Sequence, residues 1–170
     1  MGVTVHFEGQ LRDQAAYDAV VREASAFAAL HGWQTARIEL ATTKLSRVRD
    51  EQDWDYEGPT KGIELRANPN CEPIRLEFDE LLYIQEYTKT QFAPPEVHET
   101  LVALLGQLAP HFVTLTVIDE GEYYESRDEQ LLLKHRDRCF EVLEHLANDK
   151  SLRGPVRLPS GRIVDLVRDA

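Results

Sequence analysis

Two runs of alternating apolar and polar residues flank the turn signal Asn68-Pro69-Asn70 and predict an antiparallel hairpin. Ile63 and Leu65 alternate before the turn, and the apolar residues of 74–78 alternate after it. A period of two is typical of a strand with one buried face, and Asn and Pro are typical of turns. This hairpin favours an α+β architecture over a doubly wound parallel sheet, in which strands and helices would alternate more regularly.

Three segments carry helix signals. Asp13 is a capping residue for a helix with an apolar face over residues 16–28, which ends before Gly32. Pro95 sits at the first position of a second helix, where its missing N–H is harmless. Ser126 and Glu129 form a capping box that predicts a third helix, whose apolar stripe is Leu132, Cys139, Phe140, Leu143 and Leu146.

Further alternating segments complete the predicted sheet. Strands are expected from Val3 to a stop at Gly9, over 35–41, over 81–87 and over 113–117 with Val113, Leu115 and Val117 on one face, and a terminal hairpin is expected within 155–167. We therefore predict one α+β domain over residues 1–170. Its sheet would be largely antiparallel or mixed, with about five to seven strands and three main helices packed on it.

The composition narrows the classes of partner. The 170-residue chain has a net charge of -11, which argues against nucleic-acid binding because neutralising phosphates requires a basic surface. The charge favours solubility or attraction to a basic protein. No apolar run is long enough to span a bilayer, and the first residues lack the features of a secretory signal. These features predict a cytoplasmic protein without membrane contact.

The segment that follows residues 113–117 concentrates carboxylates and tyrosines at a strand end. We call residues 119–125 the acidic segment; its candidate binding residues are Asp119, Glu120, Glu122, Tyr123 and Tyr124. Paired carboxylates could hold Mg²⁺ or act as general acid and base. The segment lacks the spacing of a calcium loop and has no His at ligand spacing. A protein-binding surface and a solvated strand end are the other interpretations.

A second group of aromatic residues lies among acids in the polar stretch 44–60. Trp54 and Tyr56 are interleaved with the five carboxylates of residues 50–57. Trp and Tyr often anchor protein interfaces, but a Trp in such a segment also packs at the tip of a hairpin. The sequence leaves both interpretations open.

Other reactive residues give weaker patterns. His135 and Cys139 are four apart on one helix face, but a zinc site needs three or four ligands. Cys71 precedes Glu72, which would raise its pKa and disfavour a catalytic thiolate. The basic residues of the C-terminal region could bind a phosphate or pair with the protein's own acidic loops. The chain has no P-loop, G-x-S-x-G, G-x-G-x-x-G or kinase signature.

Together these features predict a protein-binding module, such as an adaptor, a chaperone-like protein or an immunity-type inhibitor. Trp54, Tyr56 and the acidic segment would engage a protein partner, for which the net charge favours a basic protein, without a cofactor or a metal. A metal-assisted hydrolase that uses Asp119, Glu120 and Glu122 is one alternative. A small-ligand sensor with a pocket between helix and sheet is another. The sequence does not indicate an oligomeric state.

Overall fold

A computed structural model describes residues 2–149 and 151–168. The predicted α+β class is confirmed, because helices combine with sheets in which every strand pair is antiparallel. Within the described ranges, no helix has both the length and the apolar character needed to cross a membrane.

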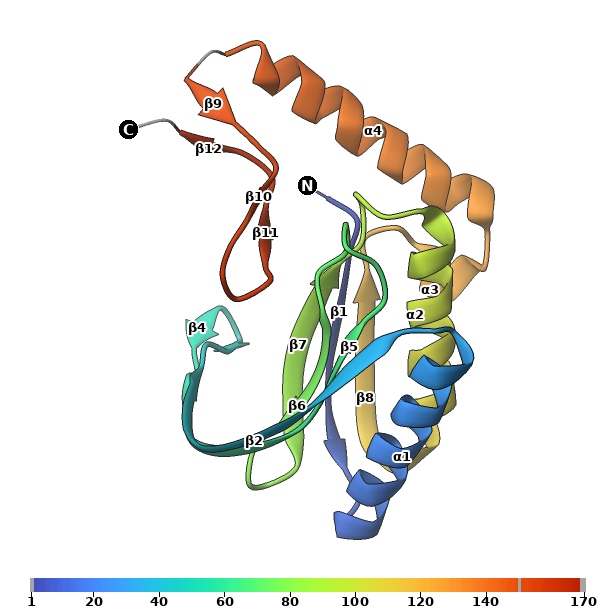
Figure 1. Ribbon diagram of the computed structural model, residues 1–170, viewed down its shortest axis with the longest axis vertical. Coiled ribbons are helices and arrows are strands. Elements are labelled where there is room, and N and C mark those ends of the chain that lie inside the picture. The colour runs from blue at the N-terminus through green and yellow to red at the C-terminus, as the bar shows by residue number, and fades with distance from the viewer. Residues whose placement is uncertain (1, 150, 169–170) are drawn as a thin grey trace.

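The first sheet is built around the N-terminal strand (Figure 1). β1 (Thr4–Leu11) is its middle strand, with β7 (Tyr83–Lys89) on one side and β8 (Phe112–Asp119) on the other. The register places His6 opposite Tyr87 in β7. Because strand side chains alternate between faces, the odd-numbered residues of β1 enter the core and the even-numbered ones point to the other side.

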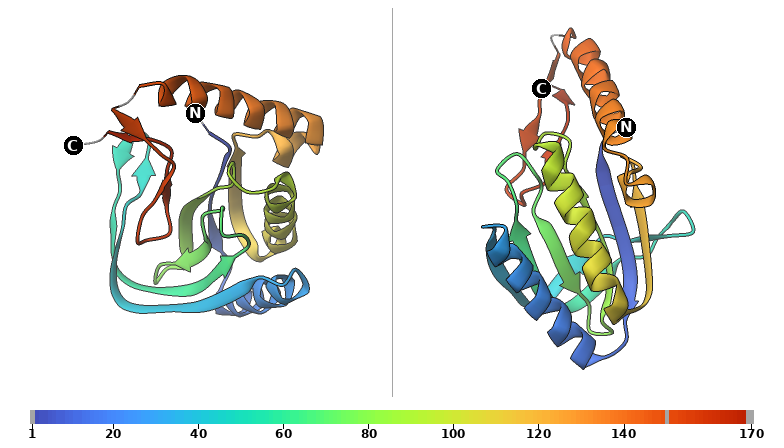
Figure 2. Two further views of the ribbon diagram at one scale, coloured as in Figure 1. Left: turned by 45° about the horizontal axis from the view of Figure 1, so that its top comes forward. Right: turned by 90° about the vertical axis from the view of Figure 1, so that its right-hand side faces the viewer.

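The second sheet contains the predicted hairpin. β5 (Tyr56–Arg66) lies between β2 (Gln34–Leu45) and β6 (Ile74–Phe78), and the turn after β6 leads directly into β7 of the first sheet. β2 and β5 are long, and they bend away from the helices (Figure 2). As a result, their far end stands over the sheet face that no helix covers. We call this face the open face.

Two helices cover the opposite face (Figure 2). α1 (Gln14–Leu30) begins after Asp13, whose carboxylate accepts from the Ala16 N–H at 2.8 Å, and α2 (Pro95–Leu108) begins with its proline, both as predicted. Their apolar faces pack on the sheets, where burial of each large side chain contributes about 1.5–3 kcal/mol. The largest fully buried side chains include Leu11, Ile63, Leu65, Leu76, Phe78, Ile84, Leu101, Leu104 and Leu105.

The third long helix, α4 (Glu129–Ala147), lies across one end of the sheets (Figure 1). Only Leu132 and Cys139 of its predicted stripe are buried, and Leu146 is exposed.

The chain then forms the predicted terminal hairpin, which stands over the open face. The short elements are β3 (Val48–Arg49), β4 (Gln52–Asp53), η1 (Ala109–His111), α3 (Tyr123–Ser126), β9 (Leu152–Arg153), β10 (Val156–Arg157), β11 (Ile163–Val164) and β12 (Val167–Arg168).

Two details of the first sheet differ from the sequence prediction. β1 does not stop at Gly9, because the absent side chain lets β8 approach; a Cβ there would lie 2.3 Å from the Thr114 carbonyl oxygen. The pairing of β1 with β8 also shifts register next to Leu11, which leaves Val113 as an extra residue. This bulge turns Val113 outward, so the prediction that it shares the buried face of Leu115 was wrong: it is 66% exposed.

Candidate functional site

A buried polar network lies at the start of the acidic segment. Asp119 ends β8, and its side chain is 0% exposed, whereas the side chain of His98 on α2 is 2% exposed. Asp119 Oδ2 lies 3.0 Å from His98 Nε2, and His98 Nδ1 lies 2.8 Å from Thr90 Oγ1. An ionised carboxylate only accepts, so Nε2 carries a proton. The Thr90 hydroxyl has a single proton, and it also lies 3.1 Å from the Val3 carbonyl oxygen.

Asp119 also fixes the backbone of the residues that follow it. Its carboxylate accepts from the N–H groups of Gly121 at 2.7 Å and Tyr124 at 2.8 Å. Glycine is favoured at position 121, because a Cβ there would lie only 2.7 Å from Leu132 Cδ1. Burial works against ionisation, yet the hydrogen bond from His98 and those two N–H groups outweigh it and lower the pKa of Asp119. Asp119 therefore positions the acidic segment.

The three carboxylates predicted as binding residues, Asp119, Glu120 and Glu122, have separate partners. Glu120 accepts from the Thr4 N–H at 3.1 Å, and Glu122 pairs with His135 of α4. Tyr123 and Tyr124 are half-buried, with the Arg127 guanidinium near both rings. Across residues 2–149 and 151–168, no three His, Cys, Asp or Glu side chains are grouped so that they could hold a metal ion.

The predicted capping box is wrong. α4 begins at Glu129, and Asp128 caps it by accepting from the N–H groups of Gln130 and Leu131. Ser126 instead ends α3. Arg127 has a left-handed backbone (φ 56°) that separates the two helices, and this local reversal moves the start of α4 two residues along the chain.

β8 forms one edge of the first sheet, because among the described residues it pairs with β1 alone. Hydrogen bonds at both ends show which way its backbone points. Thr4 O accepts from Glu120 N at 3.0 Å, and Arg12 N donates to His111 O at 3.2 Å. The backbone N–H and C=O groups of the even-numbered residues of β1 therefore point toward β8. In contrast, Val3 O accepts from Thr90 N on the β7 side.

The outward backbone groups of β8 follow from this pattern. In an antiparallel pair, the backbone N–H and C=O groups of successive residues point alternately toward the partner strand and away from it. Thr116 and Ile118 are opposite the even-numbered residues Glu8 and His6, so they bond to β1. Leu115 and Val117 therefore present their N–H and C=O groups to the outside. We call this row the free edge of β8.

A shallow groove lies next to the end of the free edge. It has a volume of about 410 Å³ and is lined by Val117, Ile118, Asp119, Glu122, Glu125, Ser126 and Leu131. Ile118 is 62% exposed, and Glu122 and Glu125 are exposed at the rim. The groove thus combines unpaired backbone groups, apolar side chains and negative charge.

Trp54 and Tyr56 lie far from the acidic segment, on the other side of the molecule near β4 (Figure 1). They pack around the guanidinium of Arg47, which is 2% exposed and lies 5.7 Å and 5.2 Å from their ring centres. Arg47 Nη1 donates to Asp79 at 2.7 Å. Arg49 covers Trp54 from outside at 3.4 Å. Both aromatic residues are half-buried and enclose an ion pair, so the structure does not join the two predicted groups into one surface.

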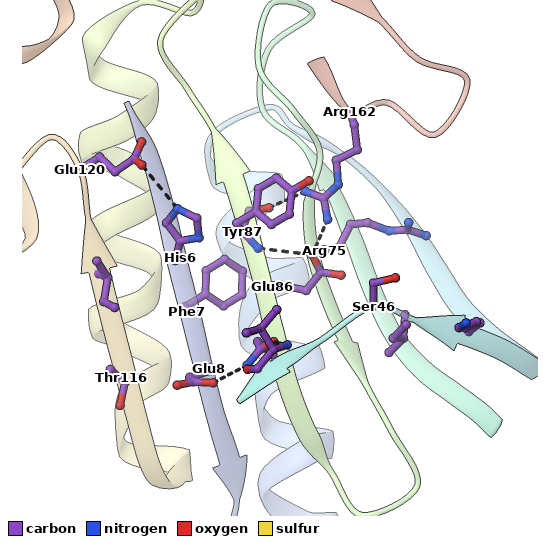
Figure 3. A pocket seen from close by; sticks show the side chains of 15 residues that line it. His6, Phe7, Glu8, Ser46, Arg75, Glu86, Tyr87, Thr116, Glu120 and Arg162 are labelled. Carbon is purple, nitrogen blue, oxygen red and sulfur yellow. Dashed lines mark hydrogen bonds and ion pairs between the residues drawn. The ribbon is translucent and has the colours of Figure 1, made fainter. Parts of the chain in front are cut away.

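A larger pocket lies on the open face, not between helix and sheet (Figure 3). Its volume is about 680 Å³. The floor contains His6, Gln85, Tyr87 and other outward-facing residues of β1, β7 and β8, and Lys44, Leu45, Ser46 and Val48 form one wall. Gln85 secures this wall, because its amide exchanges two hydrogen bonds of 2.8 Å with the backbone of Val48.

The terminal hairpin supplies another wall through Arg162. The Arg162 guanidinium lies 3.9 Å from the centre of the Tyr87 ring. It donates to the Glu86 carboxylate at 2.5 Å and to the Tyr87 carbonyl oxygen at 2.6 Å. Glu72, which is buried, accepts from the Ile163 N–H at 2.7 Å. Arg162 is therefore paired with acids of the protein itself, which is one of the two interpretations open from the sequence.

The two cysteines are buried as free thiols. Burial, reinforced by the Glu72 carboxylate, raises the pKa of Cys71 to about 12, and burial also raises the pKa of Cys139. We expect iodoacetamide at pH 8 to modify neither thiol in the folded protein, because the thiolate is the reactive form. Mass spectrometry should show both thiols modified in urea. Rapid labelling of Cys71 without urea would contradict the buried geometry.

Comparison with protein-family models, with curated proteins and with solved structures finds no match. The arrangement of the side chains and of the free edge is therefore the basis for a functional proposal.

Proposed function

We propose that this chain is a protein-binding module that takes an extended, basic segment of a partner along the free edge of β8. The observation that carries the proposal is the outward row of backbone groups at Leu115 and Val117. An added strand would pair with these groups, and its side chains would supply specificity. This mode of binding needs no cofactor.

The composition of β8 supports this role. Edge strands are usually protected from pairing by charged residues, Pro or a covering element. β8 has neither a charged residue nor Pro from Phe112 to Ile118, and it exposes Val113 and Ile118. Only the bulge at Val113 interrupts it. The remaining stretch is therefore a suitable template for another strand.

Charge favours a basic partner over a second copy of the chain. Glu122 and Glu125 lie at the groove beside the free edge, and the chain as a whole has a net charge of -11. Two such chains repel each other, whereas Lys or Arg in a bound strand would be attracted to the rim. The acidic segment thus belongs to the proposed interface through these side chains, while Asp119 holds them in place.

We also propose a cytoplasmic location. It is supported by the two free thiols, since cysteines in oxidising compartments are commonly paired in disulfides.

Ten-residue peptides test the proposed binding. One alternates Val with Lys, and the other alternates Val with Glu. We expect the Lys peptide to bind more tightly in fluorescence anisotropy. Val117→Pro should weaken its binding about tenfold relative to Val117→Ala, because only the proline removes the outward N–H, a net loss of about 1.4 kcal/mol. Pro is tolerated on a strand edge whose N–H faces solvent.

The acidic rim has a matched control on α4. Glu122→Lys with Glu125→Lys should weaken binding of the Lys peptide, whereas the same change at the exposed residues Glu141 and Glu144 should have little effect. Equal binding of both peptides, or equal affinities of the proline and alanine variants, would contradict the proposal. A dimer in sedimentation that Val117→Pro abolishes would assign the free edge to a second copy instead.

A further inference from the structure

The pocket on the open face (Figure 3) has the size of a small-molecule site. Its volume of about 680 Å³ falls within the range of about 300–1,000 Å³ that is typical of such sites. It is built from segments far apart in the chain, namely strands of both sheets, residues 44–48 and the terminal hairpin. The backbone pairing of the sheets and the Gln85 and Arg162 contacts hold these segments in place, so the pocket is formed before any ligand enters.

Apolar and aromatic groups occupy the middle of this pocket. Val48, Tyr87 and Ile118 come from three segments, and all three are exposed. Arg162 lies against the Tyr87 ring, and His6 is 5.7 Å from it. An apolar or aromatic body of a ligand would therefore remove several exposed apolar side chains from water.

The charges of the pocket are divided between its two sides. Figure 3 shows Glu8 and Glu120 on the side of β1 and β8, and Arg75 and Arg162 on the side of β6 and the terminal hairpin. The full lining has three acids and three bases, with Lys44 and Glu86 as the remaining pair. With neutral His6 the formal charges cancel. The carboxylates disfavour a ligand with two negative charges, whereas a single negative charge can be accommodated at the basic side.

Arg75 is the cation of this pocket that remains available for a ligand. Arg162 is held by Glu86, the Tyr87 carbonyl and Glu72. Lys44 pairs with Asp55 at 3.1 Å. Arg75 has longer ion pairs, at 3.5 Å to Glu64 through Nε and at 3.6 Å to Glu77 through Nη2, and its side chain is 29% exposed. A guanidinium with unused donors matches the two oxygens of a carboxylate.

We infer that the pocket binds a small monocarboxylic acid with an apolar or aromatic body, whose carboxylate pairs with Arg75 and whose body packs against Tyr87. This site lies on the open face and shares the Ile118 side chain with the groove, but it uses neither the outward backbone groups of Leu115 and Val117 nor Glu122 and Glu125. Ligand binding here is therefore a property separate from the proposed binding of a partner strand.

The test uses 3-phenylpropionate as the probe, with its neutral amide and phenyl phosphate for comparison, in NMR titrations of the full chain. We expect saturable shifts from the acid at residues 45–48, 75 and 85–87. The amide and phenyl phosphate should bind at least tenfold more weakly. Arg75→Met should weaken binding of the acid at least tenfold, and Arg75→Lys should weaken it less because the charge is retained.

Arg138→Met is the control, because Arg138 is exposed on α4 and lines none of the pockets described. It should leave the affinity for the acid unchanged, as should Val117→Pro. The ¹⁵N spectrum of Arg75→Met without ligand shows whether this variant is folded, and Tyr87→Ala gives an independent loss of affinity if it is not. Absence of saturable shifts, equal binding of acid and amide, tighter binding of phenyl phosphate, or full affinity in folded Arg75→Met would overturn the inference.

Discussion

Asp119→Ala should lower the free energy of unfolding by about 3 kcal/mol or more, because three donors lose their acceptor and each unsatisfied buried polar group costs about 1–3 kcal/mol. The substitution leaves His98 without its acceptor and the N–H groups of Gly121 and Tyr124 without theirs. Urea denaturation measures the change. Glu125→Ala is the control: Glu125 is exposed in the same segment, so its loss should stay within about 0.5 kcal/mol.

The contribution of Asp119 should also depend on pH. Its pKa is lower in the folded protein than the unfolded value of about 3.9, so the carboxylate stabilises the fold above that value. The stabilisation is lost as the pH falls through the folded pKa. The difference in unfolding free energy between the native sequence and Asp119→Asn should therefore be constant near neutral pH and shrink below about pH 4. A difference that grows on acidification would show that Asp119 is protonated in the folded state.

Arg47→Met should have a comparable effect, with a loss of about 3–5 kcal/mol, because it leaves the Asp79 carboxylate buried without its cation. Asp79 also accepts from the N–H groups of Leu81 and Tyr83, so the turn between β6 and β7 depends on it. Arg49→Met is the control in the same hairpin. It removes a contact with Trp54, which contributes about 0.5–1 kcal/mol, and a side-chain hydrogen bond with Tyr83, but it leaves no buried charge without a partner.

The Arg47 result has a second readout. The fluorescence of Trp54 should change in folded Arg47→Met, because the substitution removes the guanidinium that lies next to the Trp54 ring. A loss below about 1 kcal/mol would indicate that the ion pair is exposed to solvent in solution. In that case Trp54 and Tyr56 would be accessible as interface residues, as the sequence alone allowed.

Local signals predicted the elements whose ends are decided locally. Asp13 caps α1 and Pro95 opens α2, because each acts on the first turn of its own helix. The same reasoning failed for α4. Ser126 and Asp128 are both capping residues, and the choice between them depends on the left-handed Arg127. The sequence pattern has no signal for that reversal.

The parts of the candidate site that the sequence did not predict depend on contacts between distant segments. Arg47 lies in the polar stretch 44–60, where the sequence has no signal for burial, yet Asp79 and aromatic rings from two segments bury it. His98 had one usable signal: it precedes Leu101 and Leu105 by three and seven positions, so it lies on the buried face of α2. The pocket on the open face had none, since alternating polar residues such as His6 and Glu8 usually indicate a solvated strand face.

The central position of β1 has a consequence for how the chain assembles. β1 precedes both of its partner strands in the chain, and Val5 pairs with Thr88 on one side and with Asp119 on the other. The first sheet therefore cannot be completed until the ribosome has passed β8, and until then one edge of β1 lacks the strand that it pairs with. Such distant pairings close large loops before any contact stabilises them, which makes folding slower than in a helical bundle of similar length. A chain stalled before β8 would expose the unpaired edge of β1 to aggregation.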